Sequence, residues 1–231
     1  MEQDQAAEAI RVVIVDDEQL VRSGLRMILG AAPDIEVVAD CSGGQAVETV
    51  LAYRPDVLML DIRMPDVDGL TVLRRLNAQR TAELPAVMML TTFDTDEYLT
   101  TALREGARGF LHKDTEPEQL AHAVRVLASG GSTLDPSVTT TVIGGFVDGI
   151  DGLQEAANAV RQLTARELEV LALLGQGLSN GAIAEQMHLA HSTVKDHVSA
   201  ILGKLGGLNR VQAAVLAERA GLGRPRPRNP A

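Results

Sequence analysis

The chain has 231 residues, of which 45% are hydrophobic and 23% are charged, a globular composition that excludes a wholly disordered protein. No apolar run approaches the roughly 18 residues needed to cross a bilayer, and Met1–Ile10 lacks the basic start and apolar core of a signal peptide. A single cysteine, Cys41, excludes a disulfide within the chain and a cysteine metal cluster. We therefore expect a cytoplasmic protein without a membrane partner, built as one large domain or two small ones.

The formal net charge of −10 is unevenly distributed along the chain. Residues 1–130 hold 22 Asp and Glu against 12 Lys and Arg, whereas residues 161–231 hold five acidic against nine basic residues. Charge is informative only when it is considered domain by domain. The acidic total therefore does not exclude nucleic acid as a partner of the C-terminal third.

Residues 11–130 alternate short apolar runs with amphipathic segments such as Leu20–Leu29, where apolar residues recur at helical spacing. This alternation predicts an α/β fold with a five-stranded parallel sheet that is covered by helices on both faces. In such folds the functional site lies outside the carboxyl ends of the strands. The five predicted strands are Val12–Val15, Glu36–Ala39, Val57–Leu60, Ala86–Leu90 and Gly109–Leu111.

The remaining segments divide into a linker, a helical domain and two tails. Residues 131–160 are rich in glycine and lack a sustained period, which predicts a linker. Residues 161–222 are entirely helical in pattern and predict an all-α domain of four helices. We expect residues 1–10 and 223–231 to be tails, the second of them disordered. The four predicted helices are Glu167–Leu174, Asn180–Met187, Ser192–Leu205 and Arg210–Ala220.

The ends of the predicted strands bring together acids, a hydroxyl group and an amine. Asp16 and Asp17 follow the first strand, Asp61 the third, Thr91 the fourth, and Lys113 comes shortly after the fifth. Clustered carboxylates repel one another unless a hard cation neutralises them, and Mg²⁺ prefers oxygen ligands. A carboxylate held by the metal can attack phosphorus, while Lys113 neutralises phosphoryl oxygens and Thr91 donates a hydrogen bond to one of them.

Each of these residues alone has a simpler explanation. Asp16 could be a helix N-cap, Lys113 a solvated surface lysine and Thr91 a turn residue. Their combined placement after four different strands argues against coincidence. An alternative is a phosphatase of the dehalogenase type, which also uses an aspartyl nucleophile, but its second acid two residues later is replaced here by Arg63.

Residues 11–130 resemble the receiver domain of two-component response regulators, which has a flavodoxin-like fold. The resemblance rests on three motifs, namely Val12–Asp17, Leu60–Pro65 and Phe110–Lys113. It implies that Asp61 is the phosphoacceptor, that Thr91 and Lys113 stabilise the phosphoryl group, and that Thr91 and Phe110 form a switch pair. It also implies an Mg²⁺ site, whose ligands are Asp16 (through water), Asp17, Asp61 and the backbone carbonyl of Arg63.

Two further residues are predicted to tune the lifetime of the phosphorylated form. Arg63 and Phe93 lie two residues beyond Asp61 and Thr91, at positions that should flank the phosphoryl group. A bulky Phe93 would hinder an attacking water, which predicts slow dephosphorylation. The simpler explanation is that Phe93 packs at the rim of the site.

The predicted helical domain begins with a capping box, in which Thr164 is the N-cap and Glu167 lies three residues later. Two short helices and a longer one then follow in a helix-turn-helix pattern. Residues 161–222 resemble the LuxR-type helix-turn-helix of NarL/FixJ-class response regulators, carried by Leu163–Glu167, Gly177–Asn180, Ile183–Ala184, Thr193–Val198 and Lys204–Leu205. The chain departs from this family at Ala165, Ala182 and Ala190. The last departure removes the usual cap of the third helix, whose start is then either looser or capped by Ser192.

The polar face of the third predicted helix is the candidate DNA-binding surface, although such a face is often only solvated. Lys195, Asp196 and Ser199 are expected to contact base edges. His197 and Lys204 lie to the side, where phosphate contacts are expected. The full set of candidate DNA-binding residues is Thr193, Lys195, Asp196, His197, Ser199 and Lys204.

Together the two resemblances imply a phosphorylation-controlled transcriptional regulator rather than an enzyme, apart from phosphorylation and dephosphorylation of its own Asp61. The implied partners are a sensor histidine kinase as phosphodonor, double-stranded promoter DNA, and a second copy of the chain on activation. The dimer surface is expected on the first and last receiver helices, on Arg210–Ala220, or on both. The alternative is a DNA-binding regulator that works without phosphorylation and keeps a vestigial acidic pocket.

Overall fold

The computed structural model describes residues 9–79, 84–91, 96–134, 158, 160–206, 208 and 210–222. These residues form two compact units, an N-terminal α/β unit and a C-terminal helical unit, and each is described separately. The predicted tails lie almost entirely outside the described residues, as does most of the predicted linker. Within the described part of the chain, every helix is too short or too polar to cross a membrane.

The N-terminal unit is built on a parallel sheet with the strand order β2-β1-β3-β4-β5-β6. Its strands are β1 (Ile10–Val15), β2 (Ile35–Cys41), β3 (Val57–Asp61), β4 (Ala86–Thr91), β5 (Gly109–His112) and β6 (Thr133–Leu134). The chain passes from β1 to β2 at one edge and then returns to β3 on the other side of β1. This reversal places a crevice at the carboxyl ends of β1 and β3, where α/β sheets bind their ligands.

The prediction of five strands was wrong by one, because β6 adds a sixth strand beside β5. Thr133 pairs with Gly109, and its amide donates to the carbonyl oxygen of Arg108 at 3.1 Å. The two residues of β6, Thr133 and Leu134, lie within the segment predicted as a linker. A strand of two residues is too short to carry an alternating pattern, so its pairing depends on the edge of β5 and leaves no signal in the sequence.

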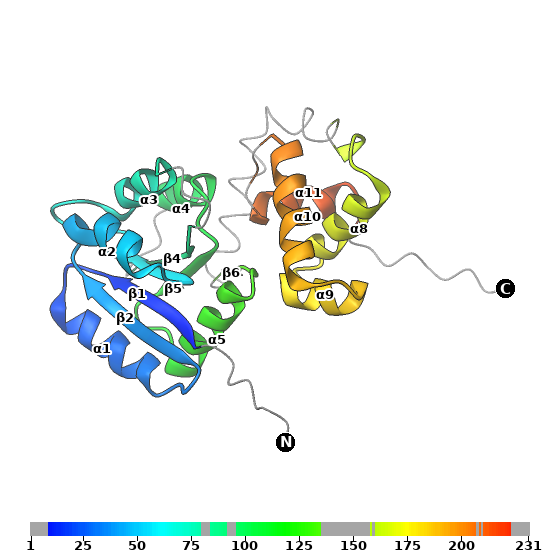
Figure 1. Ribbon diagram of the computed structural model, residues 1–231. Helices are drawn as coiled ribbons and strands as arrows, with labels where there is room; N and C mark the ends of the chain where they lie inside the picture. Colours follow the sequence, from blue (N-terminus) through cyan, green and yellow to red (C-terminus); the bar gives the residue numbers. More distant parts are fainter. Residues whose placement is uncertain are drawn as a thin grey trace, which may run out of the picture. The chain divides into compact units, whose positions relative to one another are not determined.

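Helices cover both faces of the sheet (Figure 1). On one face α1 and α5 lie side by side, and α2, α3 and α4 form a row on the other. Alternate strand residues such as Ile14, Met59 and Leu90 pack against α1 and α5. The helices are α1 (Gln19–Gly30), the 3₁₀ turn η1 (Gly43–Gln45), α2 (Ala46–Tyr53), α3 (Gly69–Asn77), α4 (Asp96–Arg104) and α5 (Pro117–Ala128).

Gly69 allows α3 to start directly against the end of β3. A Cβ atom at this position would lie 2.2 Å from the carbonyl oxygen of Asp61, which no side chain can tolerate. The amide of Gly69 donates to Ile62 at 3.0 Å, and Asp68 caps the helix by accepting a hydrogen bond from the amide of Thr71. The loop that follows Asp61 is thereby held close to the sheet.

Among its described residues the C-terminal unit holds α8 (Ala165–Gly175), α9 (Asn180–Met187), α10 (His191–Lys204) and α11 (Arg210–Arg219), which confirms the four helices predicted within residues 161–222. Its core combines Val170, Ile183 and Val198 with residues of α11 such as Leu216. The capping box of Thr164 and Glu167 is present at the start of α8.

Of the two expected starts of the third helix, a cap by Ser192 is absent and the uncapped start is the one observed. Helix α10 begins after Ala190, which has no side chain able to cap it, and Ser192 lies inside the first turn. This helix therefore starts without a side-chain N-cap, an arrangement that costs about 1 kcal/mol relative to a capped start.

Candidate functional site

Three carboxylates converge at the carboxyl ends of β1 and β3. These strands are neighbours, with Val15 opposite Leu60, so the residues that follow or end them are brought together. One carboxylate oxygen from each of Asp16, Asp17 and Asp61 lies within 4.8 Å of the others. Asp16 and Asp61 are buried, at 0% and 3% exposed, whereas Asp17 is exposed to solvent. The site therefore has two buried carboxylates and is open to solvent on the side of Asp17.

Lys113 projects into this cluster just beyond the end of β5. Pairing of β5 with β4 places it there, because the amide of Lys113 donates to the carbonyl of Thr91 at 2.9 Å. The Lys113 Nζ atom lies 2.7 Å from Asp16 Oδ2 and 3.0 Å from Asp61 Oδ2. Burial acts to lower the pKa of Lys113, but the contacts with Asp16 and Asp61 outweigh it and raise the pKa. Lys113 is therefore a charged ammonium group at neutral pH.

The environment of Asp61 opposes its ionisation. Burial raises the pKa of this carboxyl group, Lys113 offsets part of that rise, and the neighbouring charge of Asp16 adds to it. The backbone of Arg63 favours the ionised form through a hydrogen bond. A cation bound between the acids would act in the same direction as Lys113, because it stabilises the carboxylate charge.

The donor set fits a magnesium ion. All three side chains offer carboxylate oxygens, the hard ligands that Mg²⁺ selects. Asp16 Oδ1 accepts a hydrogen bond from the Glu18 amide at 2.9 Å. Asp16 Oδ2 has no hydrogen-bond partner of good geometry among the described residues and meets only the ion pair with Lys113. A buried oxygen of this kind suits a metal ion or one of its water ligands.

The expected switch residues lie on neighbouring strands. Thr91 is the last residue of β4 and is half-buried, while Phe110 on β5 is fully buried opposite Met89. Phe93, expected to tune the lifetime of the phosphorylated form, lies outside the described residues. Arg63 is exposed beside Asp61, and its guanidinium lies 5.7 Å from the centre of the Tyr98 ring on α4.

Tyr98 and Arg22 also contact residues of this site, although neither was predicted from the sequence. Tyr98 reaches Arg63 from α4, and Arg22 on α1 donates hydrogen bonds to the backbone of Asp16 and Asp17. A lone aromatic residue and a lone arginine on a polar helix face carry no motif, so only the fold reveals these contacts.

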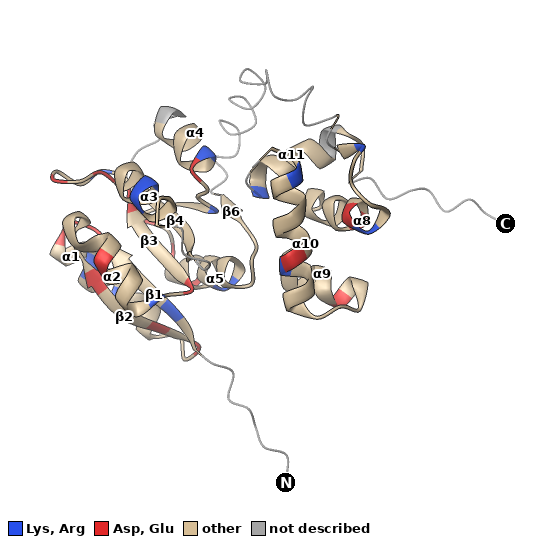
Figure 2. Ribbon diagram, turned by 45° about the horizontal axis from the view of Figure 1, so that its top comes forward, with Lys and Arg blue, Asp and Glu red and all other residues tan. Residues whose placement is uncertain are grey.

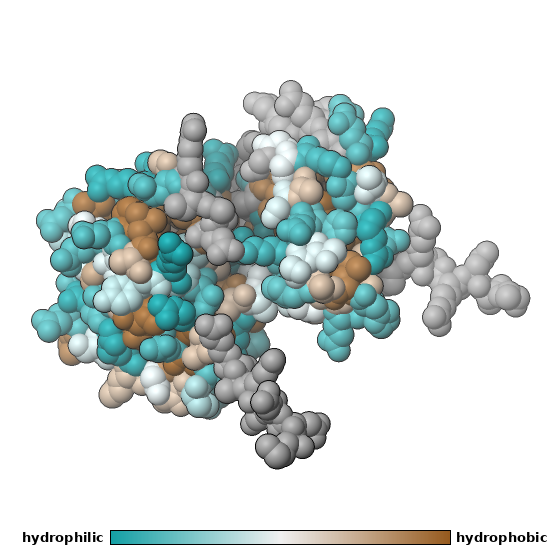
Figure 3. All heavy atoms as spheres, viewed as in Figure 1, coloured by the Kyte–Doolittle hydropathy of each residue, from teal (hydrophilic) through white to brown (hydrophobic). Residues whose placement is uncertain are grey.

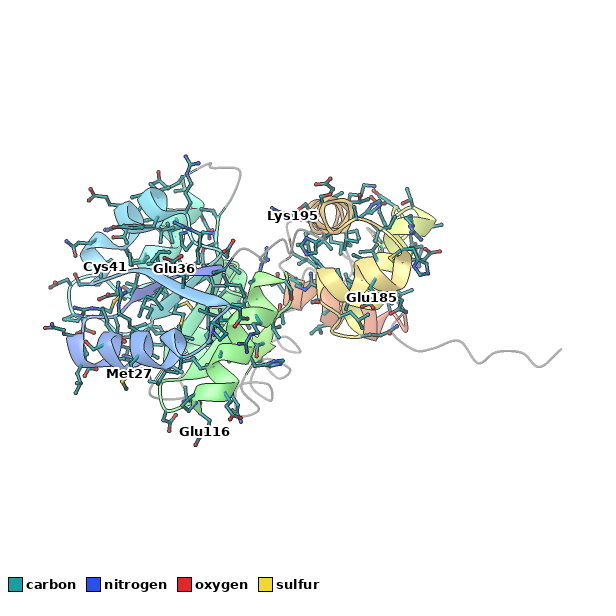
Figure 4. All side chains as sticks on the ribbon, turned by 60° about the horizontal axis from the view of Figure 1, so that its bottom comes forward. Met27, Glu36, Cys41, Glu116, Glu185 and Lys195 are labelled. Carbon is teal, nitrogen blue, oxygen red and sulfur yellow. The ribbon has the colours of Figure 1, made fainter. Side chains whose placement is uncertain are left out.

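The candidate DNA-binding residues lie on α10. Val194, Val198 and Ile201 turn one side of this helix toward the core of the unit. Basic and acidic positions lie next to each other on the helix (Figure 2), and Figure 4 labels Lys195 there. The side opposite the core is open to solvent and carries Lys195, Asp196 and Ser199 as exposed residues, with Thr193 and His197 half-buried beside them.

Lys204 has a different environment from the one expected. Its ammonium lies 2.7 Å and 2.8 Å from the two carboxylate oxygens of Glu167, at the start of α8. This ion pair gives Lys204 a structural role within the unit. The phosphate contact expected of Lys204 stays a prediction, and the structure adds a contact that joins α10 to α8.

The comparisons with known proteins agree for both units. The family of response regulator receiver domains matches residues 12–125, and the LuxR family of bacterial regulatory proteins matches residues 161–217. "Transcriptional regulatory protein LnrK" of Bacillus subtilis is 38% identical over 221 residues, which cover 92% of this chain and 98% of LnrK. "DNA-binding transcriptional activator DevR/DosR" of Mycobacterium tuberculosis is 38% identical over 217 residues, 94% of this chain and 97% of the relative. The crystal structure of response regulator ChrA from a heme-sensing two-component system has a TM-score of 0.50 and 36% identity, covering 94% of this chain and 100% of ChrA.

Proposed function

Since the chain belongs to the response regulators that join a receiver domain to a LuxR-type DNA-binding domain, we propose that phosphorylation of Asp61 controls its binding to promoter DNA. The chain is a two-component, DNA-binding transcription regulator, and its curated relatives are transcriptional regulators. The observation that carries the proposal is the placement of the Lys113 ammonium against both Asp16 and Asp61 at the mouth of an acidic cluster.

In the proposed reaction a carboxylate oxygen of Asp61 attacks phosphorus. An O–P bond forms as the bond between phosphorus and the donor, a histidine nitrogen of the kinase or an acyl oxygen, breaks. The Lys113 ammonium pairs with the transferred phosphoryl oxygens as a point charge. The Thr91 hydroxyl donates a hydrogen bond to another of these oxygens.

Four groups of this chain would hold Mg²⁺ at the site. They are the side chains of Asp17 and Asp61, the backbone carbonyl of Arg63, and Asp16 through a water molecule. The ion supplies positive charge where the phosphoryl oxygens accumulate negative charge. In the resting cluster Lys113 supplies positive charge to both Asp16 and Asp61.

Two other functions fit the structure less well. A regulator that ignores phosphorylation has no need for the contacts of Lys113 with Asp16 and Asp61. Burying these two carboxyl groups is unfavourable for their ionised form, so a regulator without this use for them would gain nothing from keeping them. A phosphatase acting on other substrates is disfavoured because the relatives of the chain are transcriptional regulators. Both alternatives predict DNA binding that acetyl phosphate and Mg²⁺ do not change.

The exposed hydrophobic side chains of α1 support a dimer as the DNA-binding form. Leu20 and Met27 are 85% and 76% exposed, and their spacing of seven residues places them on the same side of the helix. Met27 projects away from the sheet (Figure 4), and hydrophobic residues lie at the surface of this unit (Figure 3). Exposed apolar patches mark interaction surfaces, and we propose a second copy of the chain as the partner.

A double variant carrying Leu20→Asp and Met27→Asp is expected to accept phosphate normally and to remain monomeric. Because pairing two DNA-binding units on one operator raises affinity by about 100-fold or more, acetyl phosphate should no longer increase its DNA affinity. Light scattering and gel-shift titrations with and without acetyl phosphate measure the two effects. Leu51→Asp, at another exposed leucine on α2, is the matched control and should behave as wild type. A double variant that still dimerises on phosphorylation would place the interface elsewhere.

The exposed polar residues of α10 are proposed to distinguish base pairs. Asp196→Ala and Ser199→Ala should each relax discrimination by ~1–3 kcal/mol at particular positions of the operator, while Lys195→Ala lowers affinity as well. Titrations of the cognate duplex and of single-base variants at several salt concentrations measure these effects. Glu116→Ala, an exposed acid of the N-terminal unit, is the control. Full sequence preference in the Asp196 and Ser199 variants would mean that another face reads DNA.

A further inference from the structure

Arg22 on α1 connects the turn that contains Asp16 and Asp17, called here the acidic turn, to β2. Its Nη1 atom donates to the carbonyl oxygens of Asp16 and Asp17 at 2.8 Å and 3.2 Å, and its Nε atom donates to Asp40 Oδ2 at 3.1 Å. The Arg22 side chain is only 17% exposed. One guanidinium group therefore binds three oxygens, two of which belong to the backbone of the proposed metal ligands.

The two backbone oxygens that Arg22 binds lie between regular elements. The ladder between β1 and β3 ends at Val15, and α1 begins at Gln19. The carbonyls of Asp16 and Asp17 thus lie beyond the strand and before the helix. Arg22 supplies the hydrogen bonds that a strand or helix would otherwise provide. Its guanidinium group is planar, so its N–H donors point in fixed directions.

The conformation of this turn decides where the two carboxylates lie. Asp16 is fully buried against Lys113, whereas the adjacent Asp17 is exposed, yet one oxygen of each comes within 4.8 Å of Asp61. The side chains of these consecutive residues reach one point only if the backbone around them keeps a fixed orientation. The Arg22 hydrogen bonds fix the peptide between Asp16 and Asp17 and the peptide that follows Asp17.

Arg22 is itself held in place by Asp40, a carboxylate that it shares with a second arginine. Asp40 at the end of β2 accepts from Arg22 and also forms an ion pair with Arg26, one helical turn further along α1. Arg26 donates in addition to the carbonyl of Val37 at 3.1 Å. Arg26 shares the Asp40 contact with Arg22, but it binds Asp40 and Val37 rather than the turn of Asp16 and Asp17, so the two arginines form a natural comparison.

We propose that Arg22 is a positioning residue for the metal site, fixing the turn of Asp16 and Asp17 so that their carboxylates meet Asp61 around Mg²⁺. This inference rests on the proposed function, because it assumes that the acidic cluster binds the ion. Residues that orient metal ligands typically contribute about 10- to 100-fold to metal affinity. A residue that only clamps α1 to β2 would contribute to stability and leave metal affinity unchanged.

The test is calorimetric titration of the full chain with Mg²⁺ at neutral pH, without a phosphodonor. Arg22→Ala should raise the dissociation constant for Mg²⁺ by about tenfold or more. Arg26→Ala, the matched control, should stay within about twofold of wild type because its contacts lie away from the turn. Arg22→Lys keeps the positive charge but loses the planar guanidinium with its several N–H donors. Its affinity for Mg²⁺ should fall between those of wild type and Arg22→Ala.

A kinetic measurement separates positioning from a general loss of structure. The rate of labelling by acetyl phosphate in Arg22→Ala should require more Mg²⁺ for half-saturation and should approach the wild-type rate at saturating Mg²⁺. Wild-type Mg²⁺ affinity in Arg22→Ala would overturn the inference, as would an equal loss in Arg26→Ala. If Arg22→Ala does not melt cooperatively, Arg22→Lys decides, and unchanged affinity in that variant overturns it. A wild-type chain that binds no Mg²⁺ would instead refute the metal site of the proposed function.

Discussion

Replacement of Asp61 by Asn is expected to abolish incorporation of phosphate from acetyl phosphate. The amide keeps the shape of the carboxylate but has no anionic oxygen to attack phosphorus. Asp61 is buried at the end of β3, and Lys113 lies 3.0 Å from its Oδ2 atom. Asp61 is the member of the acidic cluster that lies within a β-strand. Its carboxylate is oriented by hydrogen bonds from Lys113 and from the backbone of Arg63. Intact-mass measurement after incubation with acetyl phosphate and Mg²⁺ detects the covalent phosphate directly.

The same substitution should leave the fold at least as stable as wild type. Because the pKa of Asp61 is raised in the folded chain, its ionisation opposes folding at any pH above the ordinary carboxyl pKa. The Asn side chain removes that cost at neutral pH, and Lys113 still pairs with Asp16 at 2.7 Å. A thermal melt at pH 7 tests this part of the prediction, since a large fall in melting temperature would mean that the charge of Asp61 supports the fold.

The matched control is Asp66→Asn in the loop between β3 and α3. Asp66 is exposed and lies outside the cluster of Asp16, Asp17 and Asp61. It should accept no phosphate itself, and its replacement should leave labelling unchanged. Labelling of the Asp61 variant at the wild-type level would show that another residue is the phosphoacceptor, while labelling without Mg²⁺ would contradict the metal requirement alone.

The sheet and its acidic site could be predicted because their signals are local. Buried strands such as β3 read as unbroken apolar runs, and the parallel arrangement brings their carboxyl ends to one edge whatever the details of packing. The positions of Asp16, Asp61 and Lys113 followed from those runs alone. The capping box of Thr164 and Glu167 was equally predictable, because its two partners lie within one turn.

The contacts that escaped prediction join distant parts of the chain. Lys204 and Glu167 are 37 residues apart, and Arg22 and Asp40 are 18 apart. A charged residue on an exposed helix face gives the same pattern whether it meets solvent, DNA or a partner across the fold. The sequence could therefore place Lys204 on α10 but could not show that its charge is used within the domain.

Replacement of Glu167 by Gln is expected to lower the melting temperature of the helix-turn-helix unit by several degrees at pH 7. Glu167 is only 6% exposed, and its carboxylate accepts hydrogen bonds from the Thr164 amide at 2.8 Å and from Lys204 at 2.7 Å and 2.8 Å. The Lys204 side chain is 44% exposed, so the loss comes mainly from replacing an ionised acceptor, which receives several charge-assisted hydrogen bonds, by a neutral one. Thermal unfolding of the full chain by calorimetry measures the loss.

The effect of Glu167→Gln should depend on pH in a defined direction. The hydrogen bond from Lys204, with those from Thr164, lowers the pKa of Glu167 from 4.5 to about 2. A depressed carboxyl pKa stabilises the folded state above the unfolded pKa and loses that contribution as pH falls through the folded value. The difference between wild type and Glu167→Gln should therefore be full above pH 4.5 and should shrink as the pH falls toward about 2.

Glu169→Gln is the control for this pair, because it removes an acid from the same helix. Glu169 forms an ion pair with Arg166 at 2.7 Å, but the two side chains are 59% and 42% exposed. Exposed pairs of this kind contribute little, so the control should melt within a degree or two of wild type, about 0–1 kcal/mol at most. Equal destabilisation by the two substitutions would mean that the Glu167 pair is no stronger than a surface contact.

Lys204→Met then separates the structural role of this lysine from DNA contact. If the ammonium serves only Glu167, the variant melts earlier, while the salt dependence of DNA binding by its folded fraction stays as in wild type. A lysine that neutralises a phosphate would instead reduce the slope of log affinity against log salt by about one unit when removed. Gel-shift titrations at several salt concentrations, below the melting transition of the variant, give that slope directly. A reduced slope would return Lys204 to the DNA interface and limit its contact with Glu167 to the unbound protein.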